Sequence, residues 1–173
     1  MEFRKAVPAD LVAVSAIYDR IHTREEQGTP TVGWVRHVYP TAATAEAALQ
    51  RDDLFVATEN GAIVGSAIIN RLQPDSYGGG AWQYPAPDEA VMVLHTLTID
   101  PDFGGRGLGS RFVKFYEDYA LSRNSPYLRM DTQAINLPAR SLYQKLGYAE
   151  IDIVPCTFNG IEGVQLVLLE KKL

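Results

Sequence analysis

Gly104-Gly105-Arg106-Gly107-Leu108-Gly109-Ser110 carries the strongest structural signal in the chain. The apolar residues 91–100 precede this segment and predict a strand, and residues 107–122 follow with helical spacing. Between a strand and a helix, such a turn lets the backbone approach an anion, because glycine has no Cβ and the first helical N–H groups point outward. Arg106 can add a charge-assisted contact. A turn that only reverses the chain is the alternative, but four glycines in six residues favour a ligand.

Two common nucleotide-binding motifs do not fit this turn. A mononucleotide P-loop has Lys followed by Ser or Thr after its last glycine, whereas Gly109 is followed by Ser110 and Arg111. The dinucleotide motif G-x-G-x-x-G fails because Gly105 and Gly107 lead to Ser110 at the third position. The turn also lies late in the chain and not after a first strand. The sequence therefore favours a different phosphate-bearing ligand.

Outward from the turn, the pattern predicts an α/β (α+β) fold. Strands are predicted at residues 3–6, 54–58, 62–70, 91–100, 127–132, 148–154 and 164–170, and helices at residues 8–25, 41–51, 107–122 and 137–146. Asn60-Gly61 indicates a hairpin, because both residues accept positive φ. Residues 73–88 form a long loop with several aromatic side chains, and such loops are usually functional. This order predicts a mixed sheet with helices on its faces.

Size and composition restrict the class of protein. The 173 residues, 46% of them hydrophobic, fit a single domain over residues 1–173. A net charge of -5 without a basic run disfavours nucleic acid as a partner. No apolar run approaches the ~20 residues that cross a bilayer, and no secretory signal is visible, so we expect a cytoplasmic protein without membrane association. Cys156 is the single cysteine, which excludes an intrachain disulfide and metal sites with several thiolates; we expect no metal.

Two segments resemble a known family. Residues 97–109, LTIDPDFGGRGLG, resemble motif A of the GNAT superfamily of acetyl-CoA-dependent N-acetyltransferases. Residues 136–148, NLPARSLYQKLGY, resemble motif B of the same superfamily. With the order of elements, the resemblance covers nearly the whole chain. It implies acetyl-CoA as cofactor and a mixed, mostly antiparallel central sheet of about seven strands, flanked by about four helices.

The resemblance also implies which residues contact the cofactor. The backbone of Leu97, Thr98 and Ile99, near a β-bulge, would pair with the pantetheine arm and polarise the thioester carbonyl. Asn136 would hydrogen-bond the pantetheine, cap its helix, or do both. The contacts to the pyrophosphate fall on the glycine turn, that is on Gly104, Gly105, Arg106, Gly107, Leu108, Gly109 and Ser110. The superfamily usually has Gln or Arg at the position of Gly104, so a side-chain contact from that position is lost.

Acetyl transfer to an amine requires a polarised carbonyl, a proton acceptor for the ammonium and a proton donor for the leaving thiolate. Tyr143 matches the tyrosine that many members place beside the coenzyme sulfur as general acid; a core aromatic is the alternative. His95 matches a histidine that acts through water in some members that acetylate arylalkylamines, and a buried, hydrogen-bonded histidine is its alternative. Glu89 is the second candidate for the base. An ordered water chain is the third.

The resemblance places the acceptor near the first two helices and the segment before the fourth strand. Aromatic and imidazole side chains there would stack on a planar or cationic acceptor, or close the core; they are Trp34, His37, Tyr39, Tyr77, Trp82 and Tyr84. We expect a primary amine, on a small molecule or a peptide, to attack acetyl-CoA directly in a ternary complex. A catalytically weak acyl-CoA-binding or sensing domain and a nucleotide-binding protein stay open as alternatives. Dimers are frequent in the superfamily, so a homodimer is a further expected partner.

Overall fold

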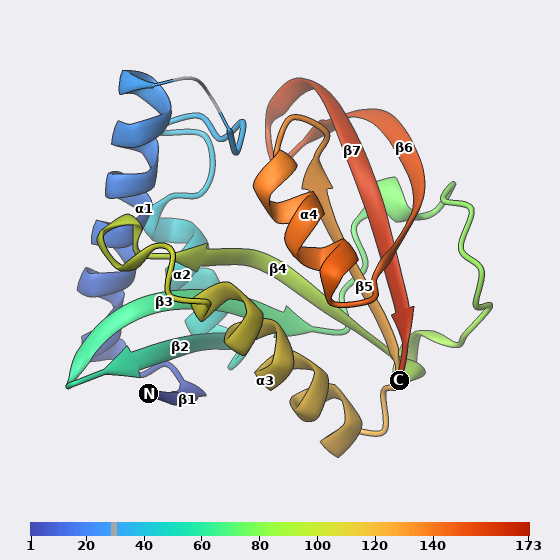
Figure 1. Cartoon of the computed structure of the whole chain (residues 1–173), viewed down its shortest axis with the longest axis horizontal. Helices are drawn as coiled ribbons and strands as arrows, with labels where there is room; N and C mark the ends of the chain where they lie inside the picture. Colours follow the sequence, from blue (N-terminus) through green and yellow to red (C-terminus); the bar gives the residue numbers. More distant parts are fainter. Residues whose placement is uncertain (29–30) are drawn as a thin grey trace.

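The computed structural model describes residues 1–28 and 31–173, and its centre is one seven-stranded sheet (Figure 1). The strands are β1 (Glu2–Lys5), β2 (Leu54–Glu59), β3 (Ala62–Asn70), β4 (Val91–Ile99), β5 (Tyr127–Gln133), β6 (Ala149–Phe158) and β7 (Ile161–Lys172). The α-helices are α1 (Leu11–Gln27), α2 (Ala42–Gln50), α3 (Leu108–Ser122) and α4 (Leu137–Lys145). The predicted order of strands and helices is confirmed.

The sheet has the order β1-β2-β3-β4-β5-β7-β6, and β4 and β5 are its parallel pair, every other neighbouring pair being antiparallel. β4 and β5 pair only from Val91 with Tyr127 to Leu94 with Met130. Beyond these pairs both strands continue but run apart, as Figure 1 shows. The backbone groups on the facing edges therefore lose their ladder partners, and a space opens between the two strands.

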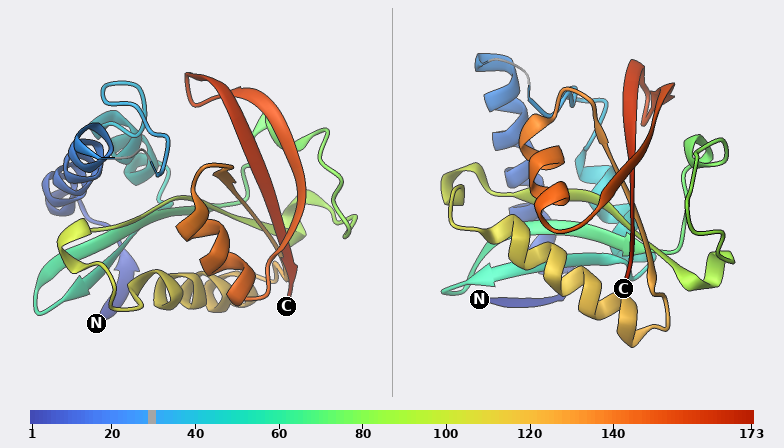
Figure 2. Two further views of the ribbon diagram at one scale, coloured as in Figure 1. Left: turned by 45° about the horizontal axis from the view of Figure 1, so that its top comes forward. Right: turned by 45° about the vertical axis from the view of Figure 1, so that its right-hand side comes forward.

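The helices cover both faces of the sheet (Figure 2). Phe55 and Ala57 of β2 lie in the cluster under α3 and α4, whereas Leu54 and Val56 lie in the cluster under α1 and α2. Successive strand residues point to opposite faces, so a strand covered on both sides is apolar throughout. Among the described residues, no helix is both long and apolar enough to cross a membrane.

A β-bulge interrupts β4 where the two strands part. Ser66 pairs with Thr98 and Ile68 pairs with His95, so three steps along β4 face two steps along β3. Thr96, inside the bulge, has a φ of 49°. A bulge redirects side chains and ends regular pairing. The bulge that the family resemblance implied beside Leu97 is present.

Three predicted boundaries require correction. Residues 8–10 form a separate 3-10 turn, because Asp10 accepts hydrogen bonds from Val7 N and from Arg4, and α1 begins only at Leu11. The strands predicted at residues 148–154 and 164–170 extend to Phe158 and start at Ile161. Asn159 and Gly160, with φ values of 51° and 78°, form a tight hairpin between them. Their Asn-Gly signal is the same as that of the predicted and confirmed hairpin at residues 60–61.

Candidate active site

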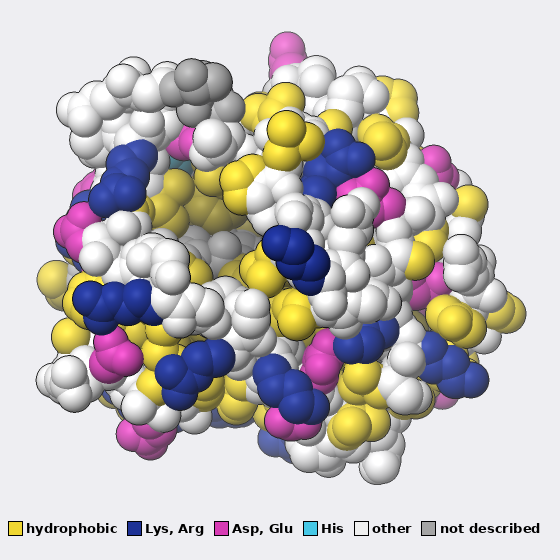
Figure 3. Space-filling model, in the orientation of Figure 1, with side chains coloured by type: hydrophobic (Ala, Val, Ile, Leu, Met, Phe, Trp, Pro, Cys, Tyr) yellow, Lys and Arg dark blue, Asp and Glu magenta, His cyan; other side chains and the backbone are white. Residues whose placement is uncertain are grey.

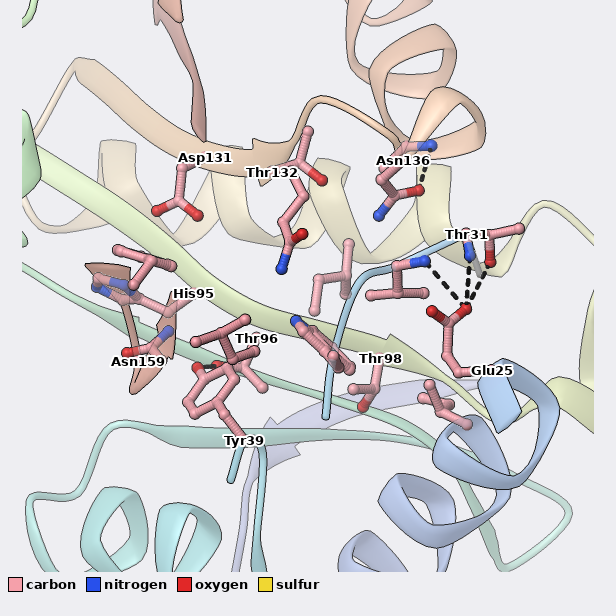
Figure 4. A pocket seen from close by; sticks show the side chains of 18 of the residues that line it. Glu25, Thr31, Tyr39, His95, Thr96, Thr98, Asp131, Thr132, Asn136 and Asn159 are labelled. Atoms are coloured by element: carbon pink, nitrogen blue, oxygen red, sulfur yellow. Dashed lines mark hydrogen bonds between the residues drawn. The ribbon is translucent and has the colours of Figure 1, made fainter. Parts of the chain in front are cut away.

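A cavity of about 350 Å³ lies between the diverging parts of β4 and β5 (Figure 4). At one end it is lined by His95, Asp131 and Asn159, here called the hairpin end because Asn159 belongs to the β6–β7 hairpin. At the other, the turn end, it is lined by Pro101 and Asn136. Figure 3 shows a hollow with apolar side chains inside and Lys or Arg side chains around it. One continuous cavity thus extends from Pro101, just before the glycine turn, to the hairpin.

The glycine turn has the backbone that an anion site requires. Gly105 and Gly107 have φ values of 77° and 70°, and a Cβ at either position would meet no atom within 4 Å. Glycine is needed there for its left-handed conformation, and both positions open to solvent. Gly104 has a φ of -60°, which any residue adopts. A Cβ on Gly109 would lie 3.0 Å from Leu142 Cδ2, so that glycine permits the close approach of α3 and α4.

An ion pair fixes the turn to α1. Arg20 Nη2 lies 2.7 Å and Arg20 Nε 3.0 Å from the two carboxylate oxygens of Asp100, which is 4% exposed. Asp100 Oδ1 also accepts a hydrogen bond from Asp102 N at 3.1 Å. One turn further along α1, Arg24 lines the cavity and pairs with Asp102 at 3.0 Å. The strand-to-helix connection therefore has a fixed position relative to the cavity.

The Arg106 side chain is engaged by other residues of the protein, which leaves the backbone groups of the turn for a ligand. Arg106 pairs with Glu59 at 3.3 Å and its guanidinium lies over the ring of Phe103 at 5.2 Å. Leu108 is 4% exposed because its side chain packs in the core, and Ser110 is half-buried in the first turn of α3. The first N–H groups of a helix have no acceptor within it and carry positive potential. They can hold a phosphate without the Gln or Arg that Gly104 replaces.

The free edge of β4 completes a site that fits acetyl-CoA. Leu97, Thr98 and Ile99 line the cavity beyond the last β4–β5 pair, where the β5 side of their backbone has no strand partner. An amide-bearing chain such as pantetheine can pair with such an edge as a strand would. The glycine turn follows the same strand, separated from it by one short 3-10 turn, Pro101–Phe103.

Tyr143 has the environment of a proton donor. It is 7% exposed and lines the cavity, and its hydroxyl has no hydrogen-bond partner within residues 1–28 and 31–173. Burial raises the pKa of Tyr143 above its ordinary value of 10.0, and Asp131 adds to the increase. The phenol therefore stays protonated at neutral pH and can donate to a group in the cavity.

Asn136 caps α4 from the turn end of the cavity. Its Oδ1 accepts a hydrogen bond from Ala139 N at 3.2 Å, and Figure 4 shows its amide nitrogen on the opposite side of the side chain. The predicted capping role is therefore confirmed. Within residues 1–28 and 31–173 the Nδ2 group has no acceptor, so it can donate to a ligand in the cavity, as the pantetheine contact would require.

His95 lies in the cavity as a neutral imidazole. Asn70 Nδ2 donates to Asp53, so Asn70 Oδ1 must accept from His95 Nε2, at 3.0 Å. Burial lowers the pKa of His95 to about 4. The imidazole is then a weak base, and its hydrogen bond to Asn70 matches the buried, hydrogen-bonded alternative.

Asp131 is a cavity carboxylate that the sequence interpretation did not single out. Its Oδ2 accepts a 2.7 Å hydrogen bond from the Tyr77 hydroxyl. Burial raises the pKa of Asp131 to about 7, although the Tyr77 hydrogen bond acts in the opposite direction. The sequence signal that could have indicated Asp131 is its place within a predicted strand, where an ionisable residue follows the apolar Met130.

Glu25 of α1 holds the wall of the cavity opposite α4. Its Oε1 accepts from Thr31 N, Thr31 Oγ1 and Val32 N at 2.8–3.0 Å (Figure 4). Its Oε2 accepts from Gly33 N at 2.9 Å. Gln133 of β5 donates to Gly33 O at 2.8 Å. These contacts tie residues 31–33 to both α1 and β5.

The predicted acceptor residues differ in their relation to the cavity. Trp34 and Tyr39 line the cavity, with ring centroids 6.0 Å apart, and the Tyr39 hydroxyl hydrogen-bonds Thr96 in the bulge. His37 lies outside this cavity, along a shallower hollow beside Trp34. Tyr77 reaches the cavity only through Asp131.

Besides His37, the predicted side chains of Trp82, Tyr84 and Glu89 lie away from the cavity, and the residues of the glycine turn lie beyond its turn end. The Trp82 ring lies 4.1 Å from the guanidinium of Arg129 and packs against the core cluster that contains Tyr77, and Tyr84 packs on Tyr127. Glu89 is exposed in the short Asp88–Ala90 turn before β4, whereas the cavity opens at the other end of that strand. The structure does not bring Glu89 together with His95.

The chain matches the model of a known protein family. A family model described as the acetyltransferase (GNAT) family matches residues 17–148. That match spans most of the chain, so the chain belongs to the GNAT family. It is accordingly an N-acetyltransferase, and acetyl-CoA is its cofactor.

Individual relatives agree with this family. The chain is 24% identical to the uncharacterized N-acetyltransferase YhfO of Bacillus subtilis (strain 168) over 152 residues, 87% of this chain and 91% of YhfO. A GNAT-family acetyltransferase from Streptococcus agalactiae 2603 has the same fold, with a TM-score of 0.84, 19% identity and coverage of 99% and 95%. The structure of yncA from Salmonella typhimurium with its cofactor acetyl-CoA has a TM-score of 0.71, 18% identity and coverage of 100% and 94%.

Proposed function

We propose that this enzyme transfers the acetyl group of acetyl-CoA to a primary amine, which attacks directly in a ternary complex. The observation that carries the proposal is the single cavity that joins the turn end to the hairpin end. Residues suited to the cofactor, such as Asn136, and residues suited to an amine, such as Asp131, line the same space (Figure 4). Both substrates can therefore be held together.

Acetyl-CoA supplies the activated acetyl group. The residues of the chain hold the reacting groups in place and donate a proton to the departing sulfur. The N–H groups at the free edge of β4, from Leu97 to Ile99, are fixed donors for a developing negative charge on an acyl oxygen. Tyr143 holds its proton at the cavity surface, where it can be given to a departing sulfur. The apolar cluster around Tyr143 keeps bulk water away from the donor.

The position of the only thiol supports direct attack over an acyl-enzyme route. Cys156 is half-buried on β6, among residues such as Val164 and Phe158, and is not part of the cavity lining. Burial raises the pKa of Cys156, which lowers the fraction of nucleophilic thiolate. The cavity therefore offers no suitable cysteine to form an acetyl-enzyme intermediate.

A panel of primary amines, each assayed with acetyl-CoA for thiol release and for the acetylated product by mass spectrometry, tests the proposal. We expect amine-dependent thiol release with one acetylated amine per thiol. Thermal stabilisation by acetyl-CoA without amine-dependent release would instead support the acyl-CoA-binding or sensing alternative. Stabilisation by ATP or NAD, and none by acetyl-CoA, would overturn the cofactor site.

A further inference from the structure

The hairpin end of the cavity contains a carboxylate and an imidazole at matching positions of two strands. His95 and Asp131 are each one residue beyond the last β4–β5 pair, Leu94 with Met130. Because strand side chains alternate, both lie on the face opposite Leu94 and Met130, and both line the cavity (Figure 4). The strands begin to part at these two residues, so the cavity opens between them.

Asp131 is the cavity carboxylate with free hydrogen-bonding capacity. The other acidic residue in the lining, Glu25, already accepts four hydrogen bonds from residues 31–33. Asp131 accepts one, from Tyr77, among the residues that the structure describes. An ionised carboxylate has about four acceptor sites, so several remain for N–H donors of a ligand.

Among the described residues, the groups that face Asp131 carry no positive charge near neutral pH. They are Tyr77 before β4, Tyr39 before α2, His95 on β4, Tyr143 on α4 and Cys156 on β6. Each is neutral near neutral pH, His95 because burial lowers its pKa to about 4. Arg24, the basic residue of the cavity lining, pairs with Asp102 at the turn end. An ammonium ion is the ligand that complements this end.

From this arrangement we propose that Asp131 receives the acceptor ammonium and takes its proton, and that the acceptor is a small primary amine with one positive charge and an apolar body. The proposal rests on the proposed function and deepens it. The body of the amine contacts apolar and aromatic lining residues, namely Trp34, Tyr39, Phe158, Ile161 and Leu166. A second cationic group would find no free acid in the described lining, and a carboxylate beside the amine would be repelled by Asp131.

The proton and electron balance of the step is complete. One ammonium proton passes to the Asp131 carboxylate, and the freed nitrogen lone pair forms the C–N bond to the acetyl carbon. The C–S bond breaks with its electron pair on sulfur, which takes the Tyr143 proton. The second nitrogen proton returns to the Tyr143 oxygen through water. Asp131 then releases its proton to solvent, so the products are the acetamide, the free thiol and one proton.

Asp131→Asn, compared with Asp118→Asn, provides the first test. Asp118 lies on the exposed face of α3, so its substitution makes the same chemical change away from the cavity. For phenethylamine as the probe, we expect Asp131→Asn to lower kcat/KM about 100-fold or more, and Asp118→Asn to leave it unchanged. Calorimetric titration of phenethylamine into the protein without acetyl-CoA should show binding when Asp131 is present and ionised, and no binding in Asp131→Asn. A variant that retains full kcat/KM overturns the proposal.

A second measurement uses the unaltered enzyme and separates proton transfer from folding defects. With phenethylamine, kcat/KM should rise with pH as Asp131 ionises; with a fluorinated ethylamine, already largely neutral at about pH 7, that rise should be much weaker. The same amine should recover most of the rate lost in Asp131→Asn. Equal pH dependence for both amines would contradict the role of Asp131. Absence of turnover with every amine would instead contradict the proposed function itself.

The substrate class is tested by comparing phenethylamine with phenylalanine and with a diamine of similar length. We expect kcat/KM for phenethylamine to exceed that for either by about 10-fold or more, through differences in KM. Preference for phenylalanine or for the diamine would overturn the assignment of a monocationic, apolar acceptor while leaving the proton transfer by Asp131 intact.

Discussion

The hydroxyl of Tyr77 donates a 2.7 Å hydrogen bond to Asp131 Oδ2. This bond stabilises the ionised carboxylate and opposes the increase in pKa that burial causes. Tyr77→Phe should therefore raise the pKa of Asp131 above about 7 and move the acidic limb of the kcat/KM profile to higher pH. Tyr84→Phe, in the same segment but outside the cavity, is the control. An acidic limb at the same pH in Tyr77→Phe would contradict this coupling.

Asp131 should lower the stability of the folded protein at high pH. Its pKa rises from 3.8 to about 7 on folding, so between these values the folded state holds a proton that the unfolded chain lacks. The free energy of unfolding falls as pH rises through this window. Asp131→Asn, which carries no ionisable group, should unfold at a higher temperature than the parent at about pH 8, and at a similar temperature at about pH 4. A difference independent of pH would refute this explanation.

Removal of the Tyr143 hydroxyl should affect the chemical step. We expect Tyr143→Phe to reduce kcat about 100-fold with little change in KM, because the lost group donates a proton in the transition state. Tyr119→Phe removes a phenol from the aromatic cluster at α3 and should leave kcat unaltered. Steady-state kinetics at varied amine concentration measure both constants. Full turnover by Tyr143→Phe would remove the assignment as general acid.

Two glycines allow backbone strain to be separated from ligand binding. Gly107 in the turn and Gly61 in the β2–β3 hairpin have φ values of 70° and 81°, and a Cβ at either meets no atom within 4 Å. Alanine at each should cost about 1 kcal/mol of stability. Only Gly107→Ala should weaken acetyl-CoA binding, measured by calorimetry, because its new methyl group lies where the anion approaches. Equal affinities in the two variants would count against the turn as the phosphate site.

Glu25 should stabilise the protein through residues 31–33. Burial raises its pKa, but hydrogen bonds from Thr31, Gly33 and Val32 outweigh burial and hold the pKa below 4.5. Its stabilising effect is therefore complete above about pH 4.5 and is lost as pH falls through the lowered value. Glu25→Gln should lower the free energy of unfolding by about 2 kcal/mol at neutral pH and raise the KM for the amine.

The control for Glu25→Gln is Glu26→Gln, because Glu26 pairs with Arg36 at the surface. Chemical denaturation at several pH values measures the stability of both variants. If the two variants lose equal stability, or if the loss in Glu25→Gln persists at about pH 3, the hydrogen bonds to residues 31–33 do not have the expected effect.

The sequence predicted those parts of the fold that depend on local pattern. Apolar alternation and helical spacing act within one segment, so the order of seven strands and four helices followed from them, and the Asn60-Gly61 hairpin followed from its turn residues. The cap by Asn136 was implied by the family resemblance of residues 136–148. The Asn159-Gly160 hairpin has an equally local signal, and Pro155 lies within the strand before it. Proline is tolerated there because β6 is an edge strand.

The hairpin end could not be predicted in the same way. Asp131 becomes a cavity residue because β4 and β5 part after Leu94 and Met130, and its pKa depends on burial by segments distant in sequence. The roles of Trp82 and Tyr84 likewise depend on contacts with Arg129 and Tyr127 on β5. A single sequence shows an aromatic-rich loop but not which partners its rings find.

The short parallel pairing between β4 and β5 also divides the sheet into two halves. Strands β1 to β4 form one half and β5 to β7 the other, and within the described residues the strand pairing between them consists of the four pairs from Val91 with Tyr127 to Leu94 with Met130. The twist between β4 and β5 over so short a pairing sets how far the two strands separate beyond it, and therefore the width of the cavity at both ends. Substitutions at these four pairs would therefore change which acyl chains and which amines are admitted without touching either.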